Sequence, residues 1–239
     1  MTEQLHLVQE WDKVFPKSDK VGHKKVTFHN HFGITLAADM YTPKNSTGKL
    51  PALAVSGPFG AVKEQSSGLY AQEMAERGFL TIAFDPSYTG ESGGTPRYMQ
   101  SPDINTEDFQ AAVDYLSTLE NVDADKIGII GICGWGGIAL NAAAIDPRIK
   151  VTVASTMYDM SRVSGNGYFD EADNDSISST IASQRVSDYV DEIAKEYENV
   201  DGKGHLKYLT VEESEESSDA ATEETADPAA ETQDEETEQ

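Results

Sequence analysis

The chain has 239 residues, of which 38% are hydrophobic, and its formal net charge at pH 7 is −24. This length and composition predict one folded domain with a single large core. The strong negative charge argues against nucleic acid and anionic membrane surfaces as partners. The single cysteine excludes an internal disulfide. The sequence contains no run of about 18 apolar residues, so we expect no transmembrane helix.

The negative charge is concentrated at the C-terminus. Residues 212–239 contain 13 acidic and no basic residues, which leaves a net charge of −11 on the preceding chain. Large apolar side chains are almost absent from this segment, so burial cannot offset the entropy of ordering it. We expect a domain over residues 1–211 and a disordered acidic tail over 212–239. The N-terminus lacks the basic and apolar regions of a secretory signal, so we expect a cytoplasmic location.

Two strands joined by a short turn are predicted first, and they should form an antiparallel hairpin. Apolar strands and helices then alternate along the chain. The hairpin strands cover residues 25–30 and 34–42, the later strands 51–56, 79–84, 126–132 and 150–154, and the helices 67–77, 106–119 and 136–145. This order predicts an α/β fold, a doubly wound and mostly parallel sheet with helices on both faces.

The chain becomes more polar after residue 159. A helix over 178–197 and a possible last strand over 205–211 are the only further elements that the pattern indicates. The C-terminal strands of the sheet therefore look incomplete. Because an unpaired apolar strand edge can pair with another chain, we expect self-association into a homo-oligomer.

Cys133 lies where an apolar strand ends and a glycine-rich turn opens a helix. Such a junction places a side chain at the carboxyl edge of a parallel sheet, where ligands bind. The positive end of the helix favours the thiolate and so raises its nucleophilicity. The backbone N–H of Gly134 should face the same position and supply half of an oxyanion hole.

The loop after the 51–56 strand should supply the second oxyanion donor. Its sequence is Gly57-Pro58-Phe59-Gly60. Because Pro58 has no N–H, Phe59 is the first candidate and Gly60 the second.

These motifs, in this order, resemble the α/β-hydrolase superfamily over about residues 22–170. The likeness rests on the hairpin, the Gly-Pro-Phe-Gly loop, the segment from Asp85 to Ser92 after the next strand, and the Gly-Ile-Cys-Gly-Trp-Gly-Gly run ending at Gly137. The branch it resembles most is that of the dienelactone-hydrolase-like and Xaa-Pro-peptidase-like enzymes, some of which carry cysteine as the nucleophile. The resemblance implies that Cys133 is the nucleophile and that Gly134 and Phe59 are the oxyanion donors. It further implies hydrolysis of a small carboxylic ester, thioester or similar acyl substrate, with no metal and no cofactor.

Two features depart from the pattern of that superfamily. The elbow motif GxSxG ends in a small residue, which allows the helix to pack close against its strand, whereas this chain has Trp135 at that position. Gly136 and Gly137 are candidates for restoring the close packing. The catalytic acid and histidine should also follow the nucleophile, yet only His205 does so. His205 is therefore the sole candidate base, but it begins the possible last strand, at the amino edge of the sheet, and should lie far from the thiol.

Two other interpretations stay open because no acid at positions 159, 170 or 188 lies in a matching motif. The first is a noncatalytic α/β-hydrolase-like binding module. The second is a dinucleotide-binding protein, because residues 134–139 fit GxGxxA at the start of a helix and Asp159 lies twenty residues further on. In dinucleotide-binding proteins, however, this pattern lies in the first strand–helix unit, whereas here it follows at least two such units.

Overall fold

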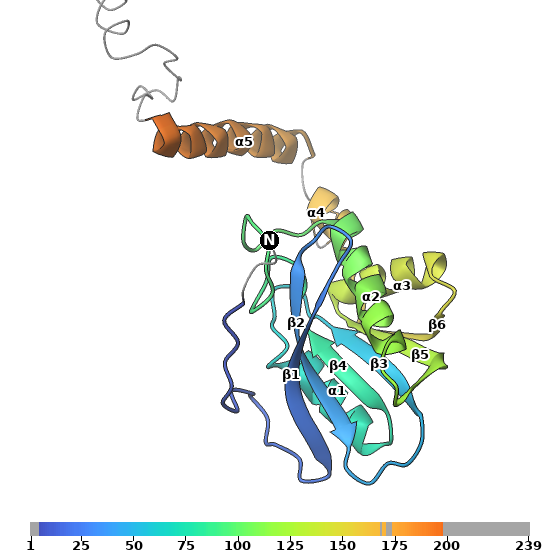
Figure 1. Ribbon diagram of the computed structural model, residues 1–239. Coiled ribbons are helices and arrows are strands. Elements are labelled where there is room, and N and C mark those ends of the chain that lie inside the picture. Colours follow the sequence, from blue (N-terminus) through green and yellow to red (C-terminus); the bar gives the residue numbers. More distant parts are fainter. Residues whose placement is uncertain (1–4, 168, 171–173, 198–239) are drawn as a thin grey trace, which may run out of the picture. The chain divides into compact units, whose positions relative to one another are not determined.

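The computed structural model describes residues 5–167, 169–170 and 174–197 (Figure 1). These residues fall into two units, divided between Asp170 and Glu171. The first holds the sheet and helices α1 to α4, and the second includes the long helix α5 (Asn174–Tyr197). The possible strand over 205–211, the expected domain end at residue 211 and the acidic tail over 212–239 lie outside the described residues and stay predictions.

Six strands form one mixed sheet in the order β1-β2-β4-β3-β5-β6. Strands β3 to β6 pair in parallel, whereas β2 is antiparallel to both of its neighbours, β1 and β4. Their bounds are β1 (Val21–His29), β2 (Thr35–Pro43), β3 (Leu50–Ser56), β4 (Leu80–Phe84), β5 (Val122–Ile132) and β6 (Ile149–Ser155). The predicted hairpin and the mostly parallel sheet are confirmed.

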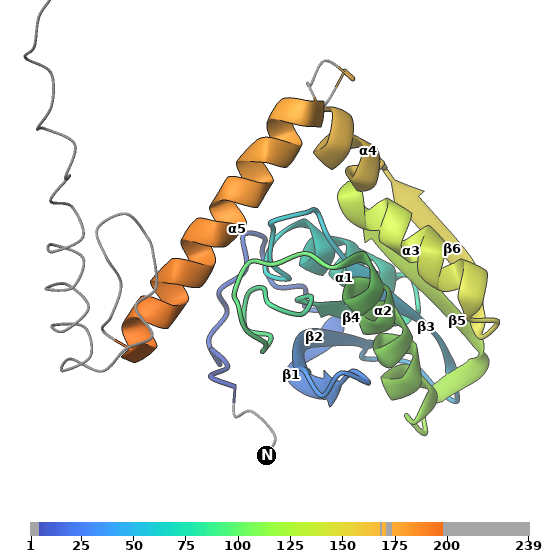
Figure 2. The same cartoon turned by 90° about the horizontal axis from the view of Figure 1, so that it is seen from above.

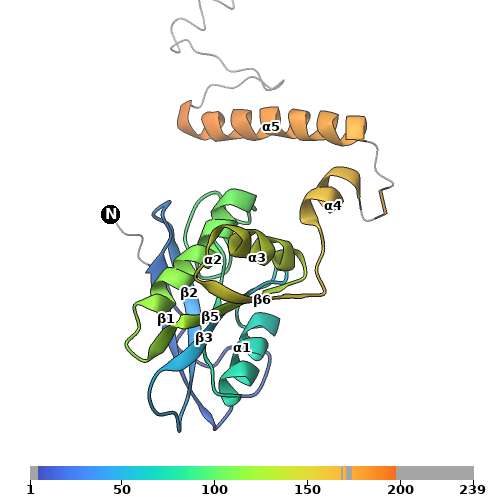
Figure 3. The ribbon, with the colours of Figure 1, turned by 90° about the vertical axis from the view of Figure 1, so that its right-hand side faces the viewer.

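Helices cover both faces of the sheet, as expected of a doubly wound fold. Helix α1 (Ser66–Glu76) lies on one face, and α2 (Pro102–Ser117) and α3 (Gly134–Ile145) lie on the other (Figure 3). The last two run side by side, which is also visible from above (Figure 2). No helix in the described part of the chain has the length and apolarity to cross a membrane.

Several elements differ from the sequence-based expectation, and β1 and β5 each begin four residues before the expected start. Helix α2 begins at Pro102, four residues before the expected start, because the Ser101 side chain accepts a hydrogen bond from the Ile104 amide and caps it. The short helix α4 (Met160–Asn166) was not predicted. It begins where the Asp159 carboxylate accepts a hydrogen bond from the Arg162 amide at 3.0 Å.

The buried side chains form one cluster on each face of the sheet. On the face of α2 and α3, the rings of Phe84, Phe109 and Trp135 meet edge to face, with Phe84 and Phe109 centroids 5.2 Å apart. The apolar stripe predicted on α2, from Phe109 to Leu116, is fully buried there. The other cluster lies under α1 and includes Leu53 and Ile132. Burial on both faces accounts for the nearly continuous apolar sequence of the parallel strands.

Strands β1 and β6 are the two edges of the sheet among the described residues, and β6 is the C-terminal one. It pairs with β5 on one side only. Val151 and Val153 on β6 are 59% and 44% exposed. This matches the expected open edge, whereas self-association through it stays a prediction.

Helix α3 lies very close to its own strand β5. A Cβ placed on Gly131 would lie 2.1 Å from the Trp135 carbonyl oxygen and 2.8 Å from the Ala139 Cβ. These are hard overlaps with backbone and with a small core side chain, so the approach requires glycine. Gly137 differs, because a Cβ there would meet only the Tyr158 carbonyl oxygen, at an ordinary 3.6 Å.

We predict that Gly131→Ala lowers the free energy of unfolding by about 2–3 kcal/mol or more, because overpacking moves the helix from its strand. The matched variant Gly137→Ala should keep or raise stability, by up to about 1 kcal/mol, because alanine favours the helix interior. Urea denaturation of both proteins gives the comparison. Equal stabilities would contradict the close approach at Gly131.

Candidate active site

Cys133 occupies a sharp turn between β5 and α3. Its backbone has φ 57° and ψ −126°, a conformation that a non-glycine residue rarely adopts. Hydrogen bonds hold it on both sides, since its amide donates to the Ser155 carbonyl at 2.9 Å and its carbonyl accepts from Gly136 and Tyr158. The side chain is partly exposed and packs beside the core cluster under α1. This strained turn is the geometry of a nucleophile elbow.

The two expected oxyanion donors lie close together beside this turn. Gly134 is the first residue of α3, and Phe59 lies in the loop between β3 and α1. A Cβ placed on Gly134 would lie 3.4 Å from the Phe59 Cβ and 2.5 Å from the Met160 Cγ. Neither amide has a backbone acceptor among the described residues. Two N–H groups are therefore available near Cys133, as an oxyanion hole requires.

Trp135 fits at the elbow because glycines surround it. Gly57 has φ 97°, and a Cβ there would lie 2.8 Å from the Trp135 Cβ. Gly136 lies against the segment that follows β6, where a Cβ would be 2.9 Å from the Met157 Cγ. Gly57 thus leaves space for the large residue that the motif does not normally carry. Of the two glycines expected to compensate, Gly136 allows α3 to approach Met157 and Ala154 closely, whereas Gly137 has no such close contact.

An ion pair between Lys63 and Asp85 fixes the loop that carries Phe59. Both side chains are fully buried. The backbone amide and the ammonium of Lys63 donate to the two carboxylate oxygens of Asp85 at 2.7 and 2.8 Å. The Glu91 amide donates to the same carboxylate at 2.9 Å. Asp85 therefore joins the loop after β3 to the loop after β4.

The electrostatics of this pair keep Lys63 charged. Burial alone would lower the pKa of its ammonium, but the charge of Asp85 and hydrogen bonds to Asp85, Glu64 and Glu91 raise that pKa above its usual value. Burial raises the pKa of the Asp85 carboxyl, and the charge of Lys63 opposes this. The two buried charges are stable there only as partners.

More ion pairs extend from Lys63 toward the N-terminal segment. Carboxylate oxygens of Asp12, Glu64 and Glu91 lie within 4.8 Å of one another, a spacing that could suit a cation. Lysines already supply the positive charge, however, since Lys25 and Lys63 lie 2.6 and 2.7 Å from Glu91. We therefore interpret this group as an ion-pair network that anchors the loops beside Cys133.

We predict that Lys63→Met or Asp85→Asn alone lowers the free energy of unfolding by about 3–5 kcal/mol, because each leaves a buried charge without its partner. The double variant should lose less than the sum of the two. Lys20→Met removes the exposed ion pair with Glu76 and should leave the urea midpoint nearly unchanged. Additive losses at Lys63 and Asp85 would show that the two charges are not coupled.

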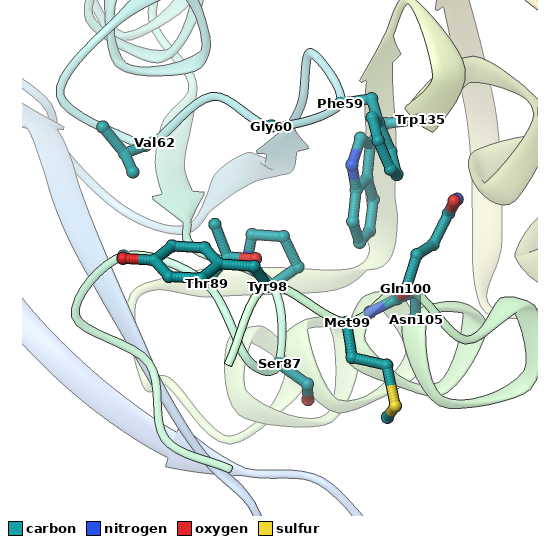
Figure 4. Close-up of a pocket in the computed structure, with 12 residues that line it drawn as sticks. Phe59, Gly60, Val62, Ser87, Thr89, Tyr98, Met99, Gln100, Asn105 and Trp135 are labelled. Carbon is teal, nitrogen blue, oxygen red and sulfur yellow. The ribbon is translucent and has the colours of Figure 1, made fainter. Parts of the chain in front are cut away.

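A cavity of about 320 Å³ opens beside the elbow (Figure 4). Phe59 and Trp135 line one end of it, and Tyr98 lies at another. Ser87 and Asn105 line its polar part. The cavity thus combines aromatic walls with a small polar surface, as small-molecule sites usually do.

A buried carboxylate holds the polar part of the cavity in place. Asp108 is fully buried and accepts hydrogen bonds from the Ser87 hydroxyl at 2.7 Å and the Asn105 amide at 3.0 Å. Burial raises the pKa of Asp108, and these hydrogen bonds oppose that effect. Asp108 has no contact with Cys133 that would make it the acid of a triad; its hydrogen bonds position the loop after β4.

The structure thus brings together Cys133, Gly134 and Phe59. His205 lies outside the described residues. Sequence reasoning missed Lys63, Met160 and Asp108. Lys63 stands in a polar loop, where nothing in the local pattern marks a lysine as buried.

A comparison with protein families identifies one match over most of the chain. The model of the X-Pro dipeptidyl-peptidase (S15) family matches residues 33–238. The chain is also 70% identical over 168 residues to the uncharacterized protein PA2218 of Pseudomonas aeruginosa, which covers 70% of this chain and 45% of PA2218. The crystal structure of PA2218 superposes with a TM-score of 0.76 at 61% identity, covering 81% of this chain and 60% of that structure.

Two relatives with named activities are more distant. The acyltransferase drtE of Aspergillus calidoustus is 34% identical over 142 residues, 59% of this chain and 45% of the relative. A thiohydrolase of Eupenicillium brefeldianum is 31% identical over 139 residues, 58% of this chain and 44% of the relative. The chain therefore spans a little under half the length of these curated relatives.

Proposed function

The chain belongs to the X-Pro dipeptidyl-peptidase (S15) family, a family of α/β-hydrolases, and we propose that it cleaves small carboxylic esters or thioesters through Cys133. The observation that carries this proposal is the strained turn at Cys133 beside two available amides, those of Phe59 and Gly134. The names of the acyltransferase and thiohydrolase relatives support acyl chemistry.

The proposed reaction has two steps. The Cys133 thiolate attacks the carbonyl carbon of the acyl group, and the amides of Phe59 and Gly134 stabilise the negative oxygen that develops. The bond to the alcohol or thiol then breaks, and that group leaves with the electron pair and takes a proton from solvent. Water then attacks the resulting acyl-cysteine and loses one proton to solvent. The bond to sulfur breaks, its electron pair restores the Cys133 thiolate, and the acyl group leaves as the carboxylic acid.

Esters and thioesters suit this site better than peptides do. An amine leaving group must be protonated as the bond breaks, which requires a positioned acid. The described residues place no such group at Cys133, whereas an alkoxide or thiolate leaves more easily. We therefore expect acyl hydrolysis to be faster than the cleavage of a peptide bond.

Cys133→Ala should abolish the cleavage of p-nitrophenyl acetate and of the acetyl thioester of N-acetylcysteamine. Because Cys133 is the only cysteine in the chain, iodoacetamide should inactivate the unmodified protein through this residue alone. Release of p-nitrophenol, with an initial burst of one equivalent, is the measurement. Equal rates for the variant and the unmodified protein would exclude Cys133 as the nucleophile.

Ligand binding without turnover would instead support the noncatalytic binding module. In that case neither protein would release p-nitrophenol, but both would show a saturable rise in melting temperature with the same ester or acid. The release of p-nitrophenol and the shift in melting temperature together therefore distinguish the two interpretations.

His205→Gln tests the sole downstream histidine in the sequence. We expect the rate of ester cleavage to change by less than about twofold, because His205 is predicted at the amino edge of a strand, beyond hydrogen-bond reach of the thiol. The pH dependence of kcat/KM, measured in parallel, should also stay unchanged. A loss of about 100-fold would make His205 the base of a catalytic dyad.

A further inference from the structure

A second and larger cavity lies on the other side of Gly134. Its volume is about 640 Å³, within the range of small-molecule sites. Residues of α3 and of the segment that joins β6 to α4 line it. Gly134 lines this cavity, whereas Phe59 lines the smaller one described above. The two expected oxyanion donors therefore separate two cavities, and Gln100 borders both.

The walls of the larger cavity are mainly apolar. Ile138 is nearly buried at 8% exposure, whereas Leu140 and Met157 expose 46% and 48% of their surface. Large apolar side chains gathered around one hollow indicate a binding site for an apolar group.

Two polar side chains of this cavity, those of Asn141 and Asp159, already have partners. The Asn141 amide donates to the Thr106 hydroxyl at 2.9 Å, and the Asp159 carboxylate caps α4 through the Arg162 amide. Its lining residues, all of them in the described part of the chain, include no lysine and no arginine. A carboxylate or phosphate group would therefore lose its hydration without gaining a charged partner.

Met160 forms the wall between this cavity and the elbow. Its Cγ and sulfur would lie 2.5 and 2.9 Å from a Cβ on Gly134, so the side chain covers the first turn of α3 directly. A thioether side chain is flexible and adapts to apolar ligands of different shape. Met160 therefore lies directly beside Gly134, the residue that follows Cys133.

We propose that the larger cavity binds the alkyl tail of the acyl group, so that the substrates are medium-chain acyl esters or thioesters. This inference rests on the proposed function of Cys133. The smaller cavity, with its aromatic and polar walls, then receives the leaving group.

The test is a series of p-nitrophenyl esters from acetate to octanoate, cleaved by the full chain. Each buried methylene contributes about three- to fourfold in kcat/KM, so burial of only about half of the methylenes that octanoate adds should favour it over acetate by at least about 30-fold. Gly137→Leu places a side chain in the cavity at a position where a Cβ has ordinary contacts. It should lower the ratio of octanoate to acetate at least about tenfold.

Ala144→Leu is the matched control, because it adds the same side chain to the same helix at an exposed position outside the cavity. It should keep the octanoate-to-acetate ratio of the unmodified protein. An equal fall of the ratio in both variants would overturn the proposal, since the effect would then come from the helix and not from the cavity.

Binding can be measured without turnover in the Cys133→Ala protein. Octanoate should raise its melting temperature, acetate should not, and Gly137→Leu in the same background should remove the octanoate effect. If octanoate binds in this way but no ester is cleaved by any variant, the proposed function fails and the tail site stands. If acetate is cleaved through Cys133 with no preference for chain length and no octanoate shift, the tail site fails and the proposed function stands.

Discussion

The buried ion pair of Lys63 and Asp85 determines the position of the loops around the elbow. Asp85 directly follows β4, and its carboxylate accepts hydrogen bonds from the amide and the ammonium of Lys63 and from the Glu91 amide. The loop after β3 must therefore keep one path, and this path brings Phe59 beside Gly134. A buried charge pair contributes little net stability, but it penalises every arrangement that separates the two charges. Its main effect here is a single loop geometry at the carboxyl edge of the sheet.

Close packing of α3 against β5 produces the second constraint. Gly131 allows the helix to approach its strand, and Gly57 leaves space for the large side chain of Trp135. Trp135 in turn packs against Phe84 and Phe109 in the core. The strained backbone of Cys133 is thus held by contacts on both sides, and the strain costs free energy that this packing offsets. The packing of the core therefore stabilises the strained turn at the position that the glycine-rich sequence predicts for Cys133.

Membership in the S15 family and the geometry of the elbow both support the proposed acyl chemistry. The family match concerns the fold and the class of enzyme, whereas the elbow concerns individual residues. The relatives establish the fold and a hydrolase family, while the chain spans a little under half of their length. Within this chain, the proposed oxyanion donors Gly134 and Phe59 each border one cavity. An acyl substrate extends on both sides of its carbonyl, which is why we propose one cavity for each part.

The sequence by itself determined the fold class, the hairpin, the order of strands and helices, and the position of Cys133, because these depend on local periodicity and on glycine-rich turns. It could not reveal the fully buried Lys63, the role of Gly57 beside Trp135, or the cover that Met160 provides over Gly134. These contacts join residues that are distant in the chain, and neither residue of such a pair carries a local signal for the other. Only the tertiary structure decided them, because burial and close approach exist once the sheet has brought the loops together.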